Sequence, residues 1–593
     1  MPTLAQFLEL RSALPTSFSP DGEQVLALSN LTGTMQLYRV AREGGDLEQL
    51  TDYDEPVGGV YLPTRDAIVL QADVGGNERL QLSLFEPATR ATTPLAHDPE
   101  HIHRYGGASR DSRWITYGCN KRNGVDFDVY VRAVDGDEER LVFSLGGWCE
   151  PGGFSPDGRW IAVEHLTEKS GDNDLYLAPV DGGDAIHVSP HDDEALFAPP
   201  SWLPDSSAFY FATNTGRDTS AIARYDMATR SWEYVIEDEW DLLCHIDHAG
   251  RHLVVSANED GYSRVEVRDA RTLELRAEVP LTSRGVVGMP CFSRDGRYLA
   301  YHFTSPTVPG DVWLYDIDTG DTRRLTQSPG EVGADEMVEP ELVRFASFDG
   351  ESIPAFVLVP KDGEPPHPVI VVVHGGPEGQ TTAVFGPLMQ YFAANGYAVV
   401  APNVRGSTGY GKRFEHLDDV YKRMDSVKDM LGLHDWLAGD VRFDESRVVL
   451  YGGSYGGYMV LAGLAFFPER WAAGVDIVGI SNLVTFLENT SEWRRAFRER
   501  EYGSLERDRD FLLSVSPITR VGDIRAPLFI IHGRNDPRVP VTEAEQIHRE
   551  LVSHGVRAEL LVYDDEGHGL NKLKNRLDAY PKAVAFLDEV LGR

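Results

Sequence analysis

Cysteine is scarce in this sequence, and the few cysteines are isolated. There are four in 593 residues, Cys119, Cys149, Cys244 and Cys291, and none forms a Cys-x-x-Cys pair. This excludes a disulfide framework and a cysteine-rich zinc site, so we expect reduced thiols and a cytoplasmic protein. The sequence also lacks long apolar runs and a basic, apolar start, so neither a membrane span nor a secretory signal is expected.

Positive charge is also in short supply. The chain has 56 Lys and Arg residues against 93 Asp and Glu residues, a formal net charge of −37. Residues 1–340 hold 57 acidic and 28 basic residues, a net charge of −29, and residues 341–593 hold 36 and 28, a net charge of −8. Such a polyanion is not expected to bind nucleic acid or an anionic membrane through bulk charge. The acidic surface is either a solubility or salt adaptation or a field that steers cationic substrates.

A turn signature recurs through the first half of the chain. It typically reads Ser-Pro-Asp-Gly or a close variant and is followed by an alternating strand, as expected for a hairpin. The spacing between copies is 44 to 48 residues, which is typical of propeller blades rather than of a two-sheet sandwich. The seven copies are anchored at Pro20, Thr64, Arg110, Pro156, Pro204, Ala249 and Arg294. The sequence therefore predicts a seven-bladed β-propeller.

The pattern changes near residue 340. Val369–Val373 is a continuous apolar run, as a strand buried on both faces requires. Further short apolar strands then alternate with helical patterns, which predicts a doubly wound, mainly parallel α/β sheet of the α/β-hydrolase type. A chain of this length is too long for one hydrophobic core, so we expect two main domains, 13–340 and 341–593.

The strongest local motif is Gly-Gly-Ser-Tyr-Gly at 452–456, which fits Gly-x-Ser-x-Gly. A buried strand is expected at 448–451, and a helix of small and apolar residues at 459–467. The strand-to-helix turn requires glycines because its neighbours pack without Cβ atoms, and it lifts the Ser454 hydroxyl to a helix N-terminus. This context predicts that Ser454 is a nucleophile; the alternative is a structural serine in a glycine-rich loop.

A serine nucleophile needs a base and an orienting carboxylate, which follow it in the order acid then His in α/β-hydrolases. Asp536 lies just beyond the expected strand 528–531, and His568 lies on a glycine-flanked loop beyond the last expected strand, 558–562. We therefore expect a triad of Ser454, Asp536 and His568. The competing residues nearby are the acids Asp523, Asp564 and Asp565 and the histidine His532.

Two backbone amides should bind the oxyanion that forms in acyl transfer. Tyr455 directly follows the nucleophile and supplies one N–H. His-Gly-Gly-Pro at 374–377 follows the early strand, and Gly376 is the predicted second donor because Pro377 has no N–H. This chemistry requires no metal and no cofactor, and we expect none.

At this point the chain resembles the prolyl oligopeptidase family of serine peptidases, in its acylaminoacyl-peptidase-like branch. The resemblance covers almost the whole chain and includes the propeller repeats and the serine elbow. The other matching motifs are His-Gly-Gly-Pro at 374–377, Arg-Gly-Ser-Thr-Gly-Tyr-Gly at 405–411, Asp536 with Arg-Val-Pro at 538–540, and Glu-Gly-His-Gly at 566–569. The resemblance implies the triad and the oxyanion donors named above. It also implies that residues 1–12 form a helix packed on the hydrolase domain, and that the propeller covers the mouth of the active site.

The substrate pocket is harder to predict. Val539, Phe486 and Trp493 are candidates for an apolar pocket, or they fill the core instead. Arg405 is either a substrate contact or a buried structural charge. Four arginines between residues 493 and 500 either pair with nearby acids or include one that holds a substrate carboxylate.

Dipeptide release is not expected. In the family that the chain resembles, the dipeptidyl branch holds the substrate amine with a pair of glutamates on its propeller. The adjacent pair here, Glu138-Glu139, lies in an expected turn outside the sequence context of that motif.

Three classes of function fit the sequence. The first is a serine oligopeptidase that hydrolyses short peptides through an acyl-enzyme on Ser454. The alternative is a carboxylesterase on the same scaffold, and the third is a propeller binding module with an inactive hydrolase half. The intact triad order and the glycine elbow argue against the third. The expected partners are short peptides, and the sequence leaves the oligomeric state open, a homo-oligomer included.

Overall fold

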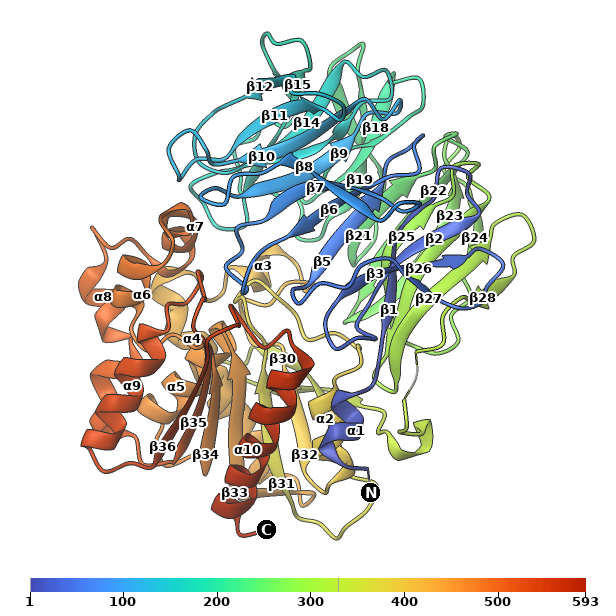
Figure 1. The fold of residues 1–593 in the computed structure, drawn as a ribbon. Helices are drawn as coiled ribbons and strands as arrows, with labels where there is room; N and C mark the ends of the chain where they lie inside the picture. Colours follow the sequence, from blue (N-terminus) through green and yellow to red (C-terminus); the bar gives the residue numbers. More distant parts are fainter. Residues whose placement is uncertain (1, 329) are drawn as a thin grey trace.

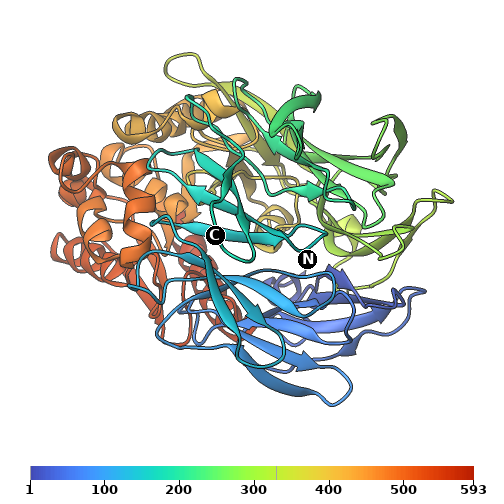
Figure 2. The ribbon, with the colours of Figure 1, turned by 90° about the horizontal axis from the view of Figure 1, so that it is seen from above.

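The computed structural model describes residues 2–328 and 330–593. Two parts are evident in Figure 1, where strands coloured blue to green lie above a sheet and helices coloured yellow to red. In the view from above, the blue, teal and green strands lie over the other part (Figure 2). No helix of the described residues is both long and apolar enough to cross a membrane.

The first 28 strands form seven four-stranded antiparallel sheets, each made of four consecutive strands. This confirms the predicted seven-bladed propeller. Blades one to four consist of β1 Ala13–Phe18, β2 Gln24–Ser29, β3 Gln36–Ala41, β4 Glu48–Gln49; β5 Val57–Tyr61, β6 Ile68–Ala72, β7 Gln81–Glu86, β8 Ala91–Ala96; β9 His103–Ala108, β10 Trp114–Cys119, β11 Asp128–Ala133, β12 Glu139–Phe143; β13 Cys149–Phe154, β14 Trp160–Leu166, β15 Asn173–Pro179 and β16 Ile186–His187. Blades five to seven consist of β17 Ser201–Trp202, β18 Ala208–Thr213, β19 Ala221–Asp226, β20 Ser231–Ile236; β21 Asp241–Ile246, β22 His252–Glu259, β23 Tyr262–Asp269, β24 Leu275–Glu278; β25 Val286–Phe292, β26 Tyr298–Ser305, β27 Val308–Asp316 and β28 Thr322–Arg324.

The repeated turn signature joins the first and second strands of the blades. In the first copy, the Ser19 hydroxyl donates to Asp21 Oδ1 at 2.6 Å and the Gln24 amide donates to Ser19 Oγ at 3.0 Å. Gly22 has φ of 75°, a left-handed conformation in which glycine is favoured. The same serine-to-aspartate bond recurs in later copies, for example from Ser155 to Asp157 at 2.7 Å. The repeat in the sequence is therefore a repeat of one hydrogen-bonded turn.

The propeller ring closes without a shared strand. The first strand, β1, pairs with β2 inside its own blade, and the last blade is complete in itself. The first and last blades meet through buried side chains, among them Ala13, Phe18, Tyr298 and Leu314. This joint is therefore made by side chains alone: apolar packing inside, with an ion pair between Arg323 and Glu43 at 2.9 Å on the exposed side.

The remaining strands form one eight-stranded sheet in the order β29-β30-β32-β31-β33-β34-β35-β36. From β32 onward neighbouring strands are parallel, and the β29–β30 and β30–β32 pairs are antiparallel. The strand bounds are β29 Glu341–Ala346, β30 Ser352–Leu358, β31 His367–Val373, β32 Ala398–Pro402, β33 Phe443–Gly453, β34 Ala473–Ile477, β35 Leu528–Gly533 and β36 Ala558–Tyr563. This confirms the predicted α/β-hydrolase sheet.

Helices cover both faces of this sheet. Successive residues of β31 alternate between two cores: Val369 and Val371 pack in one, and Ile370 packs in the other. The first core includes α4, α5 and α9, and the second includes α1, α2 and α10. The helix bounds are α1 Leu4–Leu8, α2 Pro387–Ala394, α3 Lys412–Glu415, α4 Arg423–Ala438, α5 Tyr455–Phe466, α6 Leu483–Asn489, α7 Glu492–Tyr502, α8 Arg509–Ser514, α9 Thr542–Ser553 and α10 Leu573–Leu591, with 3₁₀ turns η1 Ala334–Glu336, η2 Val420–Lys422 and η3 Pro517–Asp523.

The N-terminal helix α1 lies against the hydrolase part, beside α2 (Figure 1). Leu4 and Leu8 join the core that contains α10. Phe7 is fully buried, and its ring lies 6.0 Å from that of Tyr391 in α2. The chain therefore starts on the hydrolase, builds the propeller from Ala13, and returns to the hydrolase at β29.

Candidate active site

Ser454 stands at the turn between β33 and α5. Its backbone angles, φ 57° and ψ −119°, are unusual for a residue other than glycine and fit a strained strand-to-helix turn. A Cβ atom on Gly452 would lie 2.3 Å from the Gly456 carbonyl oxygen, and one on Gly456 would lie 2.1 Å from that of Val373. Both glycines are therefore required by close backbone packing, as the sequence motif suggested.

Asp536 and His568 come together at the carboxyl ends of β35 and β36. Asp536 Oδ2 lies 2.7 Å from His568 Nδ1. The other carboxylate oxygen accepts the amides of Arg538 at 2.8 Å and Val539 at 3.0 Å, so Asp536 is held rigidly. The Asp536 side chain is buried, whereas His568 lines the same cavity as Ser454. A proton on His568 Nδ1 would point at this carboxylate, and Nε2 would then be free to accept a proton.

The competing acids pair with other residues, and the competing histidine is held beside Asp536. His532 is fully buried, its Nε2 lies 2.9 Å from the Val539 carbonyl oxygen and 3.6 Å from Asp536 Oδ2, and burial lowers its pKa. Asp564 pairs with Arg534. The other two acids pair with basic neighbours: Asp565 with Lys572 and Lys574, and Asp523 with Arg520. Asp536 is the carboxylate that contacts His568 in the described structure.

The loop after β31 lies against Ser454. A Cβ atom on Gly375 would lie 3.4 Å from Ser454 Cβ, and Gly376 lines the cavity beside Ser454. The Tyr455 side chain points away into the core, where its hydroxyl donates to Asp418 Oδ2 at 3.0 Å. Its amide belongs to the first turn of α5, whose N–H groups have no partner within the helix. Both predicted oxyanion donors are thus close to Ser454 in the chain fold.

The active-site cavity has a volume of about 430 Å³. Both Val539 and Phe486 line it and are 2% exposed. Its other apolar walls come from Ile480, Phe497 and Tyr502. The propeller contributes Gly171 and Leu196 to the same wall, and no feature of the sequence marked these residues.

Trp493 lies in a second cavity, of about 580 Å³, between the two parts. Its ring lies 5.2 Å from that of Trp148 and 5.8 Å from that of Phe127, both in the propeller. His568 lines this cavity too. Trp493 is therefore separated from the two apolar candidates in the first cavity.

Arg405 lies outside the lining of both cavities. It is 2% exposed, and its guanidinium donates to Asp429 at 3.0 Å and to Asp349 at 2.9 Å. Both of its charge partners are within the protein, so it has no free donor directed at a substrate. The structure thus places Arg405 as a buried structural charge, the alternative that the sequence left open.

Glu139 is the first residue of β12 and does not reach either cavity. It pairs with Lys121 and accepts a bond from the Tyr117 hydroxyl within its own blade. The adjacent glutamates of the propeller are therefore poorly placed to hold a substrate amine.

Four arginines line the active-site cavity: Arg494, Arg498 and Arg500 from α7, and Arg538 from the loop after Asp536. The sequence had marked the run at 493–500, with pairing to nearby acids as one interpretation. That pairing is incomplete. Arg538 pairs with Glu78 of the propeller, but Arg494 pairs with no carboxylate that the structure describes.

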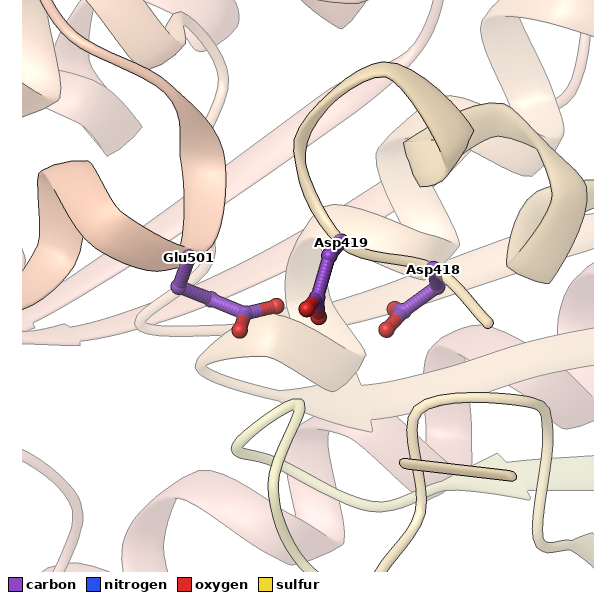
Figure 3. A group of neighbouring side chains, drawn as sticks. All are labelled: Asp418, Asp419 and Glu501. Carbon is purple, nitrogen blue, oxygen red and sulfur yellow. The ribbon is translucent and has the colours of Figure 1, made fainter. Parts of the chain in front are cut away.

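One acidic cluster lies beside Tyr455, the residue that follows Ser454. Asp418, Asp419 and Glu501 each have a carboxylate oxygen within 4.8 Å of the others, and Figure 3 shows the three groups facing one another. Arg423 pairs with both Asp418 and Glu501, and its hydrogen bond to the Tyr455 hydroxyl measures 3.1 Å. Burial raises the pKa of Asp418, and the guanidinium offsets part of that shift. The positive charge that a metal ion would bring is therefore already supplied by Arg423.

Comparison with known proteins places both parts in one family. The model of the prolyl oligopeptidase family matches residues 384–593, and that of the prolyl oligopeptidase N-terminal beta-propeller domain matches residues 135–328. A model of acetyl xylan esterase matches residues 334–424.

Individual relatives agree with this assignment. Dipeptidyl aminopeptidase BIII of Pseudoxanthomonas mexicana is 26% identical over 600 residues, 97% of this chain and 86% of that protein. The acylamino-acid-releasing enzyme of Homo sapiens is 29% identical over 43% of this chain and 35% of its own length. The fold matches a solved puromycin-hydrolyzing peptidase of Mycobacterium tuberculosis with a TM-score of 0.88 and 20% identity, covering 100% of this chain and 96% of the other. A propeller and a hydrolase part that both match one family, together with a relative aligned along nearly the whole chain, show that this protein belongs to the prolyl oligopeptidase family of serine peptidases.

Proposed function

We propose that this chain is a serine oligopeptidase that hydrolyses short peptides, with acylaminoacyl-peptidase-like activity. The observation that carries the proposal is the 2.7 Å bond between Asp536 and His568 at a cavity whose wall includes Ser454. The elbow conformation of Ser454 adds support, because it presents the hydroxyl at the start of α5.

In this mechanism Ser454 Oγ attacks the carbonyl carbon of the scissile bond while His568 Nε2 accepts the hydroxyl proton. The tetrahedral oxyanion is bound by the amides of Gly376 and Tyr455. His568 then gives its proton to the amine that leaves, and an ester on Ser454 remains. Water attacks this acyl-enzyme with His568 again as base. Asp536 keeps the imidazole oriented and stabilises its charged form throughout.

The pocket for the acyl-side residue is the apolar region around Val539 and Phe486. An apolar cavity with a few polar groups is the usual form of a specific small-ligand site. Trp493, which packs against two propeller aromatics, is proposed to contact a more distant part of the peptide. Arg405 is left out of this pocket because its donors are taken by Asp349 and Asp429.

The propeller is proposed to select substrates by size. The loops that carry the acid and the base both touch propeller residues 75–78: Asn535 Nδ2 donates to the Gly75 carbonyl at 2.9 Å, and Arg538 pairs with Glu78. A Cβ atom on Gly76 would lie 2.5 Å from the Gly567 nitrogen, so the surfaces are in close contact. A folded protein would have to separate them to reach Ser454. Cleavage of a pentapeptide but not of a large folded protein is the expected result.

The central test is Ser454→Ala, assayed with a peptide anilide. Removing a triad nucleophile reduces kcat by about 10⁶-fold in a well-studied serine protease. Labelling of the wild type, but not of this variant, by a fluorophosphonate would support the assignment. Retention of more than about a hundredth of the wild-type rate would refute it.

A carboxylesterase on the same scaffold is the second candidate. The acetyl xylan esterase model that matches residues 334–424 favours it, although that stretch contains the oxyanion loop and not the proposed triad. The triad chemistry serves esters and amides alike, so relative rates on a p-nitrophenyl ester and a peptide anilide decide between them. A rate on the anilide that is negligible beside that on the ester would favour the esterase.

A reducing compartment, such as the cytoplasm, is proposed as the site of action. All four cysteines are free, and Cys119 and Cys149 are buried. Burial also raises the pKa of the Cys119 thiol to about 11, which keeps it protonated and unreactive.

A further inference from the structure

The active-site cavity carries more positive charge than its apolar walls require. Arg494, Arg498, Arg500 and Arg538 line the same cavity as Ser454. The chain as a whole has a net charge of −37, so four arginines in one cavity run against the composition of the chain. Such a cluster needs either internal partners or a ligand of opposite charge.

Internal partners account for only part of the cluster. Arg538 pairs with Glu78, and Arg498 lies 3.6 Å from Glu378. Arg500 donates to the Thr167 carbonyl at 3.0 Å, a neutral group. Among residues 2–328 and 330–593, no carboxylate pairs with Arg494 or Arg500, and the buried Nε atoms of Arg494, Arg498 and Arg500 lack hydrogen-bond partners.

The acids of the cavity wall do not supply the missing charge. Asp172 is held by His191 at 2.9 Å and by the Ala195 amide at 2.9 Å. Burial raises the pKa of Glu415 to about 7, so this residue is only partly charged at neutral pH. Of the acids of the cavity wall, Glu378 lies within ion-pairing distance of a cluster arginine, 3.6 Å from Arg498, and Asp172 acts on Arg500 only from a longer distance. The cavity therefore has an excess of guanidinium groups.

The effect of this excess positive charge is seen at Arg494. Burial, with repulsion from Arg498 and Arg538, lowers its pKa to about 9. Its guanidinium lies over the ring of the neighbouring Trp493, with the guanidinium carbon 5.1 Å from the ring centre. A half-buried guanidinium without an anion is costly, and a carboxylate that enters the cavity can accept two parallel N–H bonds from it.

We propose that this cavity binds a carboxylate of the substrate beside the scissile bond, and that Arg494 recognises it with help from Arg498 and Arg500. The proposal rests on the proposed function, because it assigns a substrate class to the same site. The location beside the scissile bond follows from Arg498, which also donates to the Gly376 carbonyl at 3.3 Å, at the oxyanion loop.

Two sources could supply this carboxylate. One is the side chain of Asp or Glu on the acyl side of the scissile bond, and the other is the free C-terminus of a short peptide. Both present the same planar anion to the same fork of donors. The acidic surface of the propeller does not contradict this, because charges separated by more than roughly 8 Å are screened at physiological salt.

The test uses two matched pairs of substrates with the full-length enzyme. The first pair is a blocked tripeptide anilide that ends in Glu or in Gln, and the second is a blocked tetrapeptide with a free or an amidated C-terminus. For whichever pair contains the true source, the anionic member should have a kcat/KM about 10- to 100-fold higher, the value expected for a hydrogen bond to a charged group. The preference should appear mainly in KM and fall as salt rises.

The variants Arg494→Met and Arg494→Lys then test the assignment. Arg494→Met should reduce the anionic-to-neutral ratio by about 10-fold or more, and Arg494→Lys should retain part of it, because lysine keeps the charge but not the fork. Arg495→Met is the matched control. It lies on the same helix but donates to the Leu487 carbonyl at 2.8 Å, outside the cavity lining, and should leave the ratio unchanged.

The outcomes separate this proposal from the proposed function. If the wild type cleaves both members of both pairs equally well, the proposal is wrong even though the peptidase assignment stands. An equal loss on anionic and neutral substrates in Arg494→Met would also overturn it, since a structural role predicts that result. If neither member is cleaved, or cleavage survives in Ser454→Ala, the proposed function itself has failed.

Discussion

Asp476 offers the sharpest test of the energetics of this fold. It lies in β34, beneath the nucleophile elbow, and is fully buried. A Cβ atom on Gly457 would lie 2.4 Å from its Oδ1 and one on Gly479 would lie 2.0 Å away, so both glycines make room for the carboxyl group. Neither oxygen has a hydrogen bond of good geometry, although the nearby Gly479 amide partly favours the charged form.

The cost of this arrangement depends on pH. Burial raises the pKa of Asp476 from 3.8 to about 7, with a smaller contribution from the charge of Glu543. A shift of about three units corresponds to about 4 kcal/mol. Because the folded-state pKa is raised, the ionisation of Asp476 has no effect on stability at a pH where the carboxyl group is protonated in both the folded and the unfolded protein. Stability is lost as pH rises from the unfolded pKa, and the loss levels off above the folded pKa.

Asp476→Asn removes the titrating group and keeps its size. The free energy of unfolding of the variant, relative to the wild type, should increase by about 2 to 3 kcal/mol between pH 5 and pH 8.5. Urea titrations at the two pH values measure this difference. Asp362→Asn, at an exposed position, is the control and should show no such change. If the difference in unfolding free energy between the variant and the wild type is the same at both pH values, the reasoning is refuted. An unpaired amide changes stability by an amount that does not depend on pH.

Three other substitutions test separate parts of the structure. Gly456→Ala places a Cβ atom 2.1 Å from the Val373 carbonyl, so fluorophosphonate labelling should become at least about 10-fold slower, while Gly439→Ala, with its nearest contact at 3.5 Å, should label normally. Phe7→Ala should destabilise the protein by about 3 to 5 kcal/mol, seen as a lower Tm, because this ring is fully buried. Arg423→Met leaves two buried carboxylates unpaired and should cost about 3 to 5 kcal/mol by urea titration; a loss below about 1 kcal/mol would contradict the pairing.

Local patterns predicted the fold well because each one is determined by its own neighbours. The Ser-x-Asp-Gly turn is stabilised within five residues, as in the bonds of Ser19 to Asp21 and Gln24, so its repeat specifies the number of blades. The alternation of β31 between two cores likewise follows from a continuous apolar run, Val369–Val373. The elbow at Ser454 is equally local, since its glycines meet the backbone of adjacent elements.

The substrate pocket could not be predicted in the same way, because it depends on residues distant in the chain. Trp493 was expected beside Phe486, yet its ring packs against Trp148 and Phe127 from the propeller. Arg405 and Arg494 are equivalent as letters in the sequence. Arg405 finds carboxylates in the turn between β29 and β30 and in α4, and Arg494 does not. Only the assembled fold determines which arginine remains without a partner.

The closure of the propeller has a mechanical consequence. Six of the joints between blades are backed by a chain connection, but the joint between the first and last blades has none and is held by side chains, most of them apolar. Both chain segments that flank this joint run to the hydrolase, one through α1 and the other through β29. The hydrolase therefore holds the two ends of the ring together. The buried cluster around Phe7 contains residues of both flanking segments and joins them. Since apolar contacts weaken on cooling, this ring should loosen in the cold as well as in the heat, and first at this seam.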